Sequence, residues 1–223
     1  TYPKLQEVTD WTQGEKLNRE KEFLGVYVSG HPLLKYESEY NAFTNVRLGD
    51  ASSIQDVTVA RAAGVILAVR KKIDRKGKVM AFVQMEDFTG KGEVLFFADA
   101  FSKYQGILFP DSIIFVSGRA ESNGDSVRIF AGEAYPIDTI SAKFTRSITI
   151  SIKTSEQSKE LLSSLKSVLT SSSPGDCPIY FRLTGDFKGQ KIFRSRIYSV
   201  NPDSKIMNEL YKIFGHENIK IAF

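Results

Sequence analysis

The spacing of apolar residues divides the chain into a helical beginning, a strand-rich middle and a mixed end. From Leu17 to Tyr27, apolar side chains recur at helical spacing. That pattern stops at residues 29–32, which read SGHP, because Gly favours a helix end and Pro restricts the residue before it. Pro32 then begins a second short helix that reaches about Asn41. We therefore expect residues 1–56 to form a helical extension or linker.

Short runs rich in Val, Ile, Phe and Ala, separated by Gly-containing turns, occupy residues 57–138. They predict strands at residues 57–73, 79–87 and 93–97, a helix at 99–108, and strands at 112–120 and 127–134. Three strands, a helix and two strands is the element order of the OB-fold, a small closed β-barrel. Alternation along the third strand places Phe96 inside the barrel, and Leu108 at the end of the helix is expected to plug it.

The element order restarts after Ile140. The pattern predicts a strand, a helix, a two-strand hairpin, a helix and a strand, at residues 147–153, 154–169, 178–184 with 191–198, 201–214 and 218–223, with a loop at 171–176. This β-α-β-β-α-β order is typical of a split βαβ sandwich. The predicted fold is therefore mixed α and β: a helical N-terminal extension, a five-stranded OB-fold barrel, and a small α+β domain over residues 141–223.

Composition excludes several classes of protein. The residues are 42% hydrophobic and 25% charged, as in an ordinary globular protein, and no apolar run reaches the length of a membrane helix. Cys177 is the only cysteine, which excludes an internal disulfide and fits a reducing, cytoplasmic location. One Cys and two distant His cannot form a Cys/His zinc site. Because no known catalytic or phosphate-binding motif is present, we expect no catalytic residue, metal site or cofactor here.

The net charge of +4 is unevenly distributed along the chain. Residues 139–223 hold 13 Lys and Arg against 7 Asp and Glu, a charge of +6, whereas residues 1–58 carry −3. The basic last third suggests an acidic partner. In residues 59–138, which carry only +1, local clustering matters more than the net value.

The clearest candidate site is a cationic cluster at the first strand–turn–strand junction. Six cations fall within the nine residues 70–78, namely Arg70, Lys71, Lys72, Arg75, Lys76 and Lys78. OB-folds bind single strands across their second and third strands and the adjoining loops, where cations follow phosphates and aromatic rings stack on bases. Phe82 and Phe88 are the aromatic candidates, with Phe97 on the third strand as a further one, and the pattern leaves open whether Phe82 lies in the core or on the surface. The alternative is a solvated cationic hairpin.

A second candidate surface lies on the predicted hairpin of the last domain. Strict alternation puts Phe181, Phe193 and Ile197 on an apolar face. The opposite face is then exposed, basic and aromatic, with Tyr180, Arg182, Arg194 and Arg196. Such a face is expected to dock a partner protein or to meet DNA, and a solvated sheet face is the alternative.

Three residues invite a catalytic interpretation that the pattern does not favour. His31 lies between Gly30 and Pro32 at a helix start, where capping or packing is the expected role. Glu86 and Asp87 are adjacent in a strand and point to opposite faces, which argues against a metal-binding pair. Asp87 is instead expected to form the following turn.

Four motifs together resemble one known family. Residues 20–33 (EKEFLGVYVSGHPL), 76–87 (KGKVMAFVQMED), 94–97 (VLFF) and 175–180 (GDCPIY) are similar, in this order, to segments of bacterial DnaE-type DNA polymerase III alpha subunits. The resemblance is collinear over nearly the whole chain, and the first two motifs are the most specific.

The resemblance implies the C-terminal, non-catalytic part of a replicative DNA-directed DNA polymerase, a nucleotidyltransferase whose active site lies outside these residues. It implies the end of a helix-hairpin-helix region, an OB-fold that binds single-stranded template DNA, and a C-terminal domain that binds the clamp-loader tau subunit. A sliding-clamp motif is expected upstream of this fragment. Two alternatives stay open: a replisome protein-interaction module without DNA binding, and a free-standing domain that binds single-stranded RNA.

Residues 105–109, which read QGILF, match the loose Q-x-x-L-F form of a sliding-clamp peptide. They end the predicted helix of the barrel, where Leu108 is expected to be buried. We therefore interpret this match as coincidental.

Overall fold

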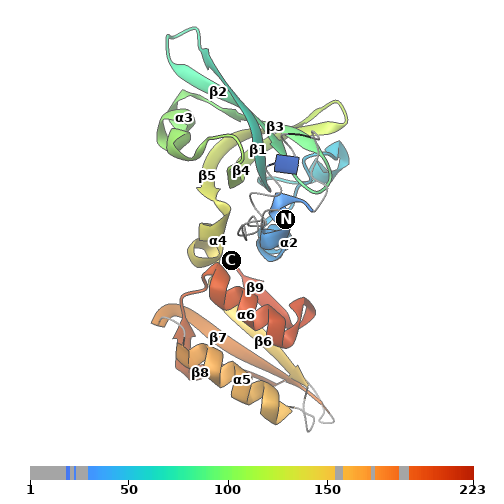
Figure 1. Cartoon of the computed structure of the whole chain (residues 1–223), viewed down its shortest axis with the longest axis vertical. Coiled ribbons are helices and arrows are strands. Elements are labelled where there is room, and N and C mark those ends of the chain that lie inside the picture. The colour runs from blue at the N-terminus through green and yellow to red at the C-terminus, as the bar shows by residue number, and fades with distance from the viewer. Residues whose placement is uncertain (1–18, 21–22, 24–29, 154–157, 172–173, 186–190) are drawn as a thin grey trace, which may run out of the picture.

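The computed structural model describes residues 19–20, 23, 30–153, 158–171, 174–185 and 191–223. Two β-sheets lie at opposite ends of an elongated molecule, and helix α4 (Ile137–Phe144) connects them (Figure 1). Most of the first predicted helix, from Leu17 to Tyr27, falls outside the described residues. The second is present as η1 (Pro32–Tyr36) followed by α2 (Glu37–Phe43), which packs against β1 and α4.

The first sheet is a closed barrel with strand order β1-β2-β3-β5-β4. Its elements are β1 (Ala60–Ile73), β2 (Val79–Glu86), β3 (Lys91–Phe96), α3 (Ala98–Tyr104), η3 (Gln105–Ile107), β4 (Ile113–Asn123) and β5 (Ser126–Pro136). Neighbouring strands are antiparallel except β3 and β5, whose parallel pairing closes the barrel. The predicted OB-fold is therefore confirmed.

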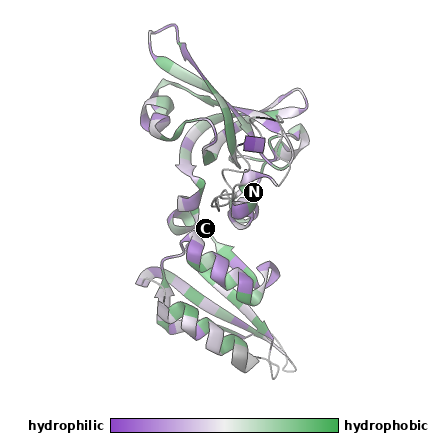
Figure 2. Ribbon diagram, in the orientation of Figure 1, coloured by the Kyte–Doolittle hydropathy of each residue, from purple (hydrophilic) through white to green (hydrophobic). Residues whose placement is uncertain are grey.

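Period-two alternation fills the barrel with side chains. Along β2, Ala81, Val83 and Met85 are fully buried, while the residues between them face outward. Phe96 and Leu108 belong to the same core, as predicted. The tip of the β1–β2 hairpin extends beyond this core and is hydrophilic (Figure 2).

Some element boundaries differ from the prediction. The first strand begins at Ala60 rather than Val57, and a short 3-10 helix, η2 (Ala51–Ile54), lies near the end of the predicted extension or linker. The predicted single helix at 99–108 is α-helical only to Tyr104 and continues as the 3-10 turn η3. Boundaries of this kind depend on tertiary contacts that local patterns do not contain.

Gly64 of β1 lies where two strands approach each other closely. A Cβ at this position would lie 2.5 Å from the carbonyl oxygen of Glu86, so the glycine permits a close approach between β1 and the end of β2. The irregularity in the β1–β2 pairing lies further along, between Ile66 and Ala68.

Asp87, the predicted turn residue, also joins the N-terminal segment to the barrel. Its Oδ1 accepts hydrogen bonds from the backbone N and the hydroxyl of Thr89, at 2.8 and 2.6 Å. Its Oδ2 accepts from the Tyr40 hydroxyl and the Leu48 backbone N, both at 2.8 Å. His31 has the predicted capping role, because its Nδ1 accepts a 3.1 Å hydrogen bond from the first turn of η1.

Helix α4 was not predicted, because it follows β5 directly without a turn. Its residues Ile137 and Ile140 are buried in a cluster with Phe43 of α2 and Phe115 of β4. Phe223, after the last strand, also contacts Phe43, with 5.2 Å between ring centroids. The two sheets are therefore joined by shared apolar packing and not only by the chain.

The second sheet has strand order β8-β7-β6-β9. Its elements are β6 (Ser147–Lys153), α5 (Ser158–Ser171), β7 (Pro174–Thr184), β8 (Lys191–Val200), α6 (Ser204–Phe214), η4 (His216–Asn218) and β9 (Ile219–Ala222). β6 and β7 are parallel, the other pairs are antiparallel, and both helices cover one face (Figure 1). The predicted β-α-β-β-α-β order is confirmed, but residues 174–176 begin β7 and are not the predicted loop.

The β7–β8 hairpin contains a bulge that the prediction lacked. Its register shifts between Pro178 and Tyr180, because β8 carries extra residues at 195–198. Alternation is broken there, so Ile197, predicted on the apolar face, is 84% exposed. Phe193 keeps its register with Phe181 but is 51% exposed on this edge strand. The predicted turn around residues 187–189 lies outside the described residues.

Within the described ranges, no helix combines the length and apolar character needed to cross a membrane. In that same part of the chain, no group of three or more His, Cys, Asp and Glu side chains could hold a metal ion. Cys177 is buried, and burial raises the pKa of its thiol to about 11. The thiol is therefore protonated and unreactive at neutral pH.

Candidate nucleic-acid interface

A row of outward-facing side chains crosses all five strands of the barrel. In the strand register, Arg70 lies beside Phe82 and Phe82 beside Leu95. Leu95 lies beside Phe130, and Phe130 beside Arg119. Side chains in cross-strand register share a face of the sheet. The residues on either side of Phe82, Leu95 and Phe130 are buried in the core, so the row points away from it.

Aromatic and cationic groups contact one another along this row. The rings of Phe97 and Phe130 are parallel within 5°, with 5.9 Å between centroids, and Phe97 is 53% exposed. The guanidinium of Arg119 lies 4.9 Å from the ring centre of Phe130, and the ammonium of Lys72 lies 5.0 Å from that of Phe82. We call this surface the aromatic face; it consists of Arg70, Lys72, Phe82, Phe97, Arg119 and Phe130. Exposed rings beside cations can stack on bases while the cations meet phosphates.

The predicted cationic cluster is divided by the pleat of β1. Arg70 and Lys72 point to the aromatic face, in register with Phe82 and Met80. The ammonium of Lys71 instead lies 5.6 Å from the ring centre of Phe101 on α3. Only part of the cluster therefore accompanies the aromatic rings.

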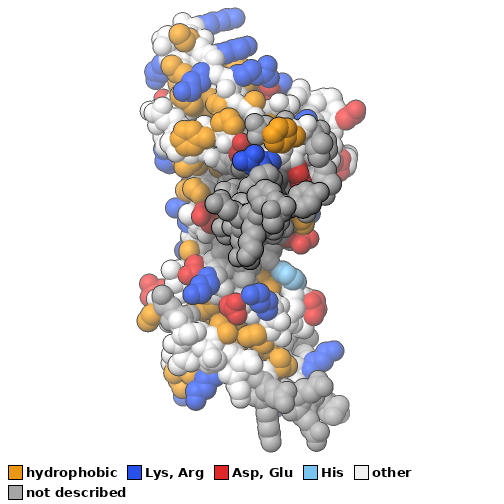
Figure 3. Space-filling model, in the orientation of Figure 1, with side chains coloured by type: hydrophobic (Ala, Val, Ile, Leu, Met, Phe, Trp, Pro, Cys, Tyr) orange, Lys and Arg blue, Asp and Glu red, His pale blue; other side chains and the backbone are white. Residues whose placement is uncertain are grey.

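At the turn of the hairpin, Asp74 organises the remaining cations. Its Oδ1 accepts hydrogen bonds from the backbone N of Lys76 and of Lys78, both at 2.8 Å. The Lys78 ammonium lies 3.5 Å from Asp99, an exposed ion pair on the α3 side. Arg75 and Lys76 lie exposed at the tip, where Figure 3 shows Lys and Arg side chains gathered over the hairpin.

An ion-pair network borders the aromatic face. Arg128 donates to Glu93 at 2.7 Å and to Glu121 at 3.3 Å, and the Glu93 contact is the main cause of its raised pKa. These carboxylates repel phosphate and neutralise Arg128. The network therefore marks a limit of the surface that suits a polyanion.

The structure separates Phe88 from the other predicted residues. Its ring packs against His31 and Tyr40, with centroid distances of 5.2 and 4.9 Å. Phe88 follows the end of β2 opposite to the hairpin, whereas Phe82 lies in the strand beside Arg70. Of the two predicted rings, only Phe82 is brought to the aromatic face.

Phe130 and Arg119 were missed by the sequence analysis. One signal could have found Phe130, because Val127, Ile129 and Ala131 alternate with it and place it on the outer side of its strand. No local signal identifies Arg119, whose position depends on the pairing of β4 with β5.

The second predicted surface is assembled in part. Ile179 and Phe181 pack in or against the core beneath the helices, so Tyr180 and Arg182 face the other way. Tyr180 lies in register with Arg194 on β8. Arg196 lies within the bulge, where alternation no longer assigns it a face. The Nε atom of Arg182 is buried, and it makes no hydrogen bond within the described part of the chain.

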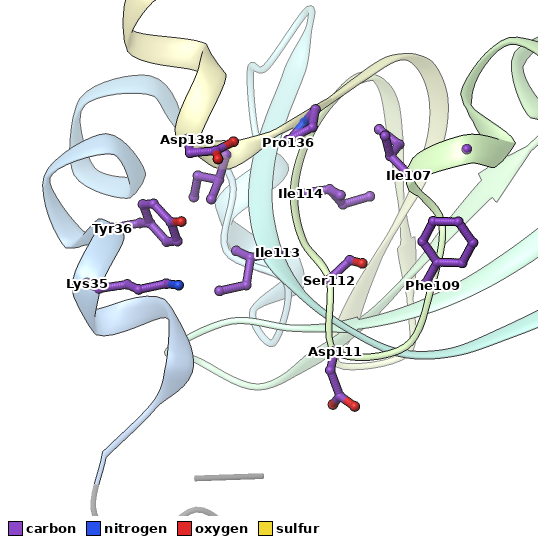
Figure 4. Close-up of a pocket in the computed structure, with 12 residues that line it drawn as sticks. Lys35, Tyr36, Ile107, Phe109, Asp111, Ser112, Ile113, Ile114, Pro136 and Asp138 are labelled. Atoms are coloured by element: carbon purple, nitrogen blue, oxygen red, sulfur yellow. The ribbon is translucent and has the colours of Figure 1, made fainter. Parts of the chain in front are cut away.

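The QGILF segment lies against a hollow of about 380 Å³ that contains no aromatic-face residue. Lys35 and Tyr36 of η1 line one side of it, and Phe109 lies on the opposite side (Figure 4). Leu108 is buried in the barrel core, as predicted. A clamp would have to withdraw Leu108 from the core to use this segment as a linear peptide.

Residues 60–137, which form the barrel and the first residue of α4, match the family described as OB-fold nucleic acid binding domain. Almost the whole chain also aligns with DNA polymerase III subunit alpha of several bacteria. The Escherichia coli K12 protein is 28% identical over 216 residues, which is 96% of this chain and 19% of that protein. The Vibrio cholerae protein is 25% identical over 223 residues, 99% of this chain and 19% of that protein.

The resemblance carried by the four motifs is therefore confirmed, and the chain spans about a fifth of the length of these relatives.

Solved structures of similar shape are more distant. A replication protein A heterotrimer bound to ssDNA is 19% identical with a TM-score of 0.28, covering 35% of this chain and 56% of that one. Yeast Rim1, a mitochondrial single-stranded DNA binding protein, is 8% identical with a TM-score of 0.30, covering 36% and 94%.

Proposed function

We propose that this chain is the C-terminal part of a replicative DNA polymerase III alpha subunit, and that residues 57–138 bind single-stranded template DNA. The aromatic face is the observation that carries the proposal. It combines three phenylalanines with three cations on the outer surface of an OB-fold barrel. The similarity of 96% of the chain to the alpha subunit supplies the biological setting.

The arrangement suggests how a strand would bind. Bases stack on the exposed ring of Phe97 and on Phe82, while Arg70, Lys72 and Arg119 neutralise phosphates. Stacking accepts any base, because every base has a π-face, so binding should show little sequence preference. The hairpin tip with Arg75 and Lys76 extends the positive potential along the strand.

The parent protein would be a nucleotidyltransferase, and these residues would position template without supplying the active site.

We further propose that residues 141–223 bind the clamp-loader tau subunit. The basic and aromatic surface around Tyr180, Arg182 and Arg194 supports a docking role, because Tyr and Arg are common interface anchors. A clamp-binding motif upstream of this fragment would complete the set of partners.

Titration of the whole chain with fluorescent single-stranded DNA at several salt concentrations tests the DNA-binding role. We expect measurable affinity that falls with salt, and weaker binding to duplex DNA of the same sequence. Charge reversal at Arg75, Lys76 and Lys78 should flatten the salt dependence. Preference for RNA would favour the RNA-binding alternative, and no binding at low salt would leave the barrel as a protein-interaction scaffold.

Surface plasmon resonance against the tau C-terminal region tests the docking role. The double variant Arg182→Glu, Arg194→Glu should lose binding, whereas Arg119→Glu on the barrel should keep it. Loss with the barrel variant alone would place the tau contact on the other domain.

A further inference from the structure

Strand β8 forms one edge of the second sheet, and within the described residues no strand pairs with its outer side (Figure 1). An edge strand presents unpaired backbone N–H and C=O groups, which can accept another strand. Natural edges are usually protected by charge or by a bulge. β8 has a bulge at residues 195–198, so the half from Lys191 to Arg194 is the regular part of the edge.

Large apolar side chains are exposed along this edge on both sides of the sheet. Phe193 lies in register with Phe181, on the side that the helices cover, yet it is 51% exposed. Ile192 lies in register with Arg182 on the opposite side and is 54% exposed. Ile197 in the bulge is 84% exposed. Apolar groups gathered in this way mark an interaction site more often than isolated ones do.

The charges on β8 have a single sign. β8 carries Lys191, Arg194 and Arg196 and no acidic residue. Two copies of β8 pairing with each other would bring these cations together, which disfavours self-association. An acidic strand would instead place a carboxylate beside the guanidinium group of Arg194, where charge-assisted hydrogen bonds form.

We propose that β8 accepts an extended acidic segment of a partner protein, with apolar residues at alternate positions, as an added strand along Lys191–Arg194. The proposal rests on the protein-docking function proposed for this domain and specifies how the partner is held. Main-chain hydrogen bonds provide affinity, and alternate side chains provide specificity. The apolar residues of the segment lie on the side of Phe193 and cover it, its acidic residues lie on the side of Ile192 and Arg194, and Ile197 packs against its end.

The test uses the whole chain labelled with ¹⁵N and a short synthetic peptide of alternating Glu and Val. We expect chemical-shift changes and slower amide exchange at residues 191–194. The same peptide methylated on alternate backbone nitrogens should not bind, because it cannot complete the ladder. A peptide with Lys in place of Glu should not bind either. Equal binding of the methylated peptide, shifts confined to Tyr180 and its neighbours, or no shifts at all would overturn the proposal.

A matched pair of variants locates the binding. Arg194→Glu should weaken the Glu-Val peptide by about tenfold or more, equivalent to about 1.4 kcal/mol. Lys220→Glu makes the same charge change on β9, the opposite edge of the sheet, and should leave affinity unchanged. Equal effects of both variants would indicate that the peptide is attracted by the overall positive charge of the domain, and would reject binding at the β8 edge. If the tau region binds while the peptide does not, strand addition at β8 is wrong and the docking function stands. If neither binds, both proposals are wrong.

Discussion

The hydroxyl of Tyr40 donates a 2.8 Å hydrogen bond to the carboxylate of Asp87. Both residues are almost fully buried, at 1% and 2% exposure. The bond ties α2, which precedes the barrel, to the turn between β2 and β3. Because the Leu48 backbone N donates to the same oxygen, one buried carboxylate joins both α2 and the segment that follows it to a turn distant in sequence.

Removing this hydroxyl should destabilise the protein. We expect Tyr40→Phe to lower the free energy of unfolding by about 1.5–3 kcal/mol, because the lost hydrogen bond has a charged acceptor. Urea unfolding at neutral pH measures the change. Tyr36→Phe, on the preceding turn and only partly buried, serves as control and should have little effect.

The Tyr40–Asp87 pair should also make the stability of the protein depend on pH. Burial, aided by the nearby charge of Asp87, raises the pKa of Tyr40 to about 12. In the unfolded chain Tyr ionises near pH 10, so wild-type stability should fall as pH rises from about 10 towards 12. Tyr40→Phe should lose less stability than wild type over that window. An identical decline in both proteins would show that Tyr40 does not contribute to it.

The aromatic face can be tested with two phenylalanines of equal exposure. Phe97 on this face is 53% exposed, and Phe109, which lies elsewhere, is 54% exposed. Phe97→Ala should weaken single-stranded DNA binding about fivefold or more, since stacking on an aromatic contributes about 1–3 kcal/mol per base. Phe109→Ala should not change affinity. Fluorescence anisotropy at fixed salt gives both values, and equal affinities would place the DNA elsewhere.

The two sides of the β1–β2 hairpin should differ in salt dependence. Arg70→Glu with Lys72→Glu removes cations from the aromatic face and should reduce the log–log salt slope by about 1.4, at about 0.7 for each single-strand phosphate. Lys71→Glu with Lys78→Glu makes the same charge change on the α3 side. Its effect on the slope should be smaller. Equal reductions would mean that phosphates follow the whole hairpin and not one face.

The buried carboxyl group of Glu39 should make the contact between the two sheets depend on pH. It is 1% exposed, and burial raises its pKa. When the pKa of a carboxyl group is higher in the folded chain than in the unfolded chain, the folded chain is most stable in acid. Its stability then falls as pH rises through the pKa of the folded chain. Burial raises the pKa of Tyr211, and the charge of Glu39 raises it further.

Glu39→Gln should therefore be more stable than wild type at neutral pH, with the difference shrinking as pH falls towards the ordinary carboxyl range. Urea unfolding across that range measures the difference. Glu37→Gln, on the exposed side of the same helix, is the control and should follow wild type. A difference that does not change with pH would show that Glu39 is not the titrating group.

The QGILF segment should not bind a sliding clamp in the folded chain. Leu108 is buried in the barrel core, and Gln105 donates to the Ser102 carbonyl oxygen at 3.4 Å. Pull-down with purified clamp should therefore recover neither the wild-type chain nor Gln105→Ala. Recovery of wild type that is lost in Gln105→Ala would reverse this interpretation.

The sequence by itself determined the strands of the two sheets, the helices α3, α5 and α6 and their order, but not α4. Alternation and helical spacing are local consequences of burying one side of each element, so both sheets and their helices were predictable. The inward position of Phe96 and the turn at Asp87 followed from the same logic. The four motifs, which depend on residue identity, carried the resemblance that alignment over 96% of the chain confirmed.

Only the tertiary structure decided which distant side chains meet. Arg119 joins Phe130 through the β4–β5 register, and Phe97 stacks on Phe130 because β3 and β5 close the barrel. The bulge that exposes Ile197 likewise depends on how β8 pairs with β7. Strand register is fixed by packing across the whole sheet, and shifting it by one residue turns each side chain to the other face. For that physical reason, local sequence patterns predicted the strands but not the surface that they form together.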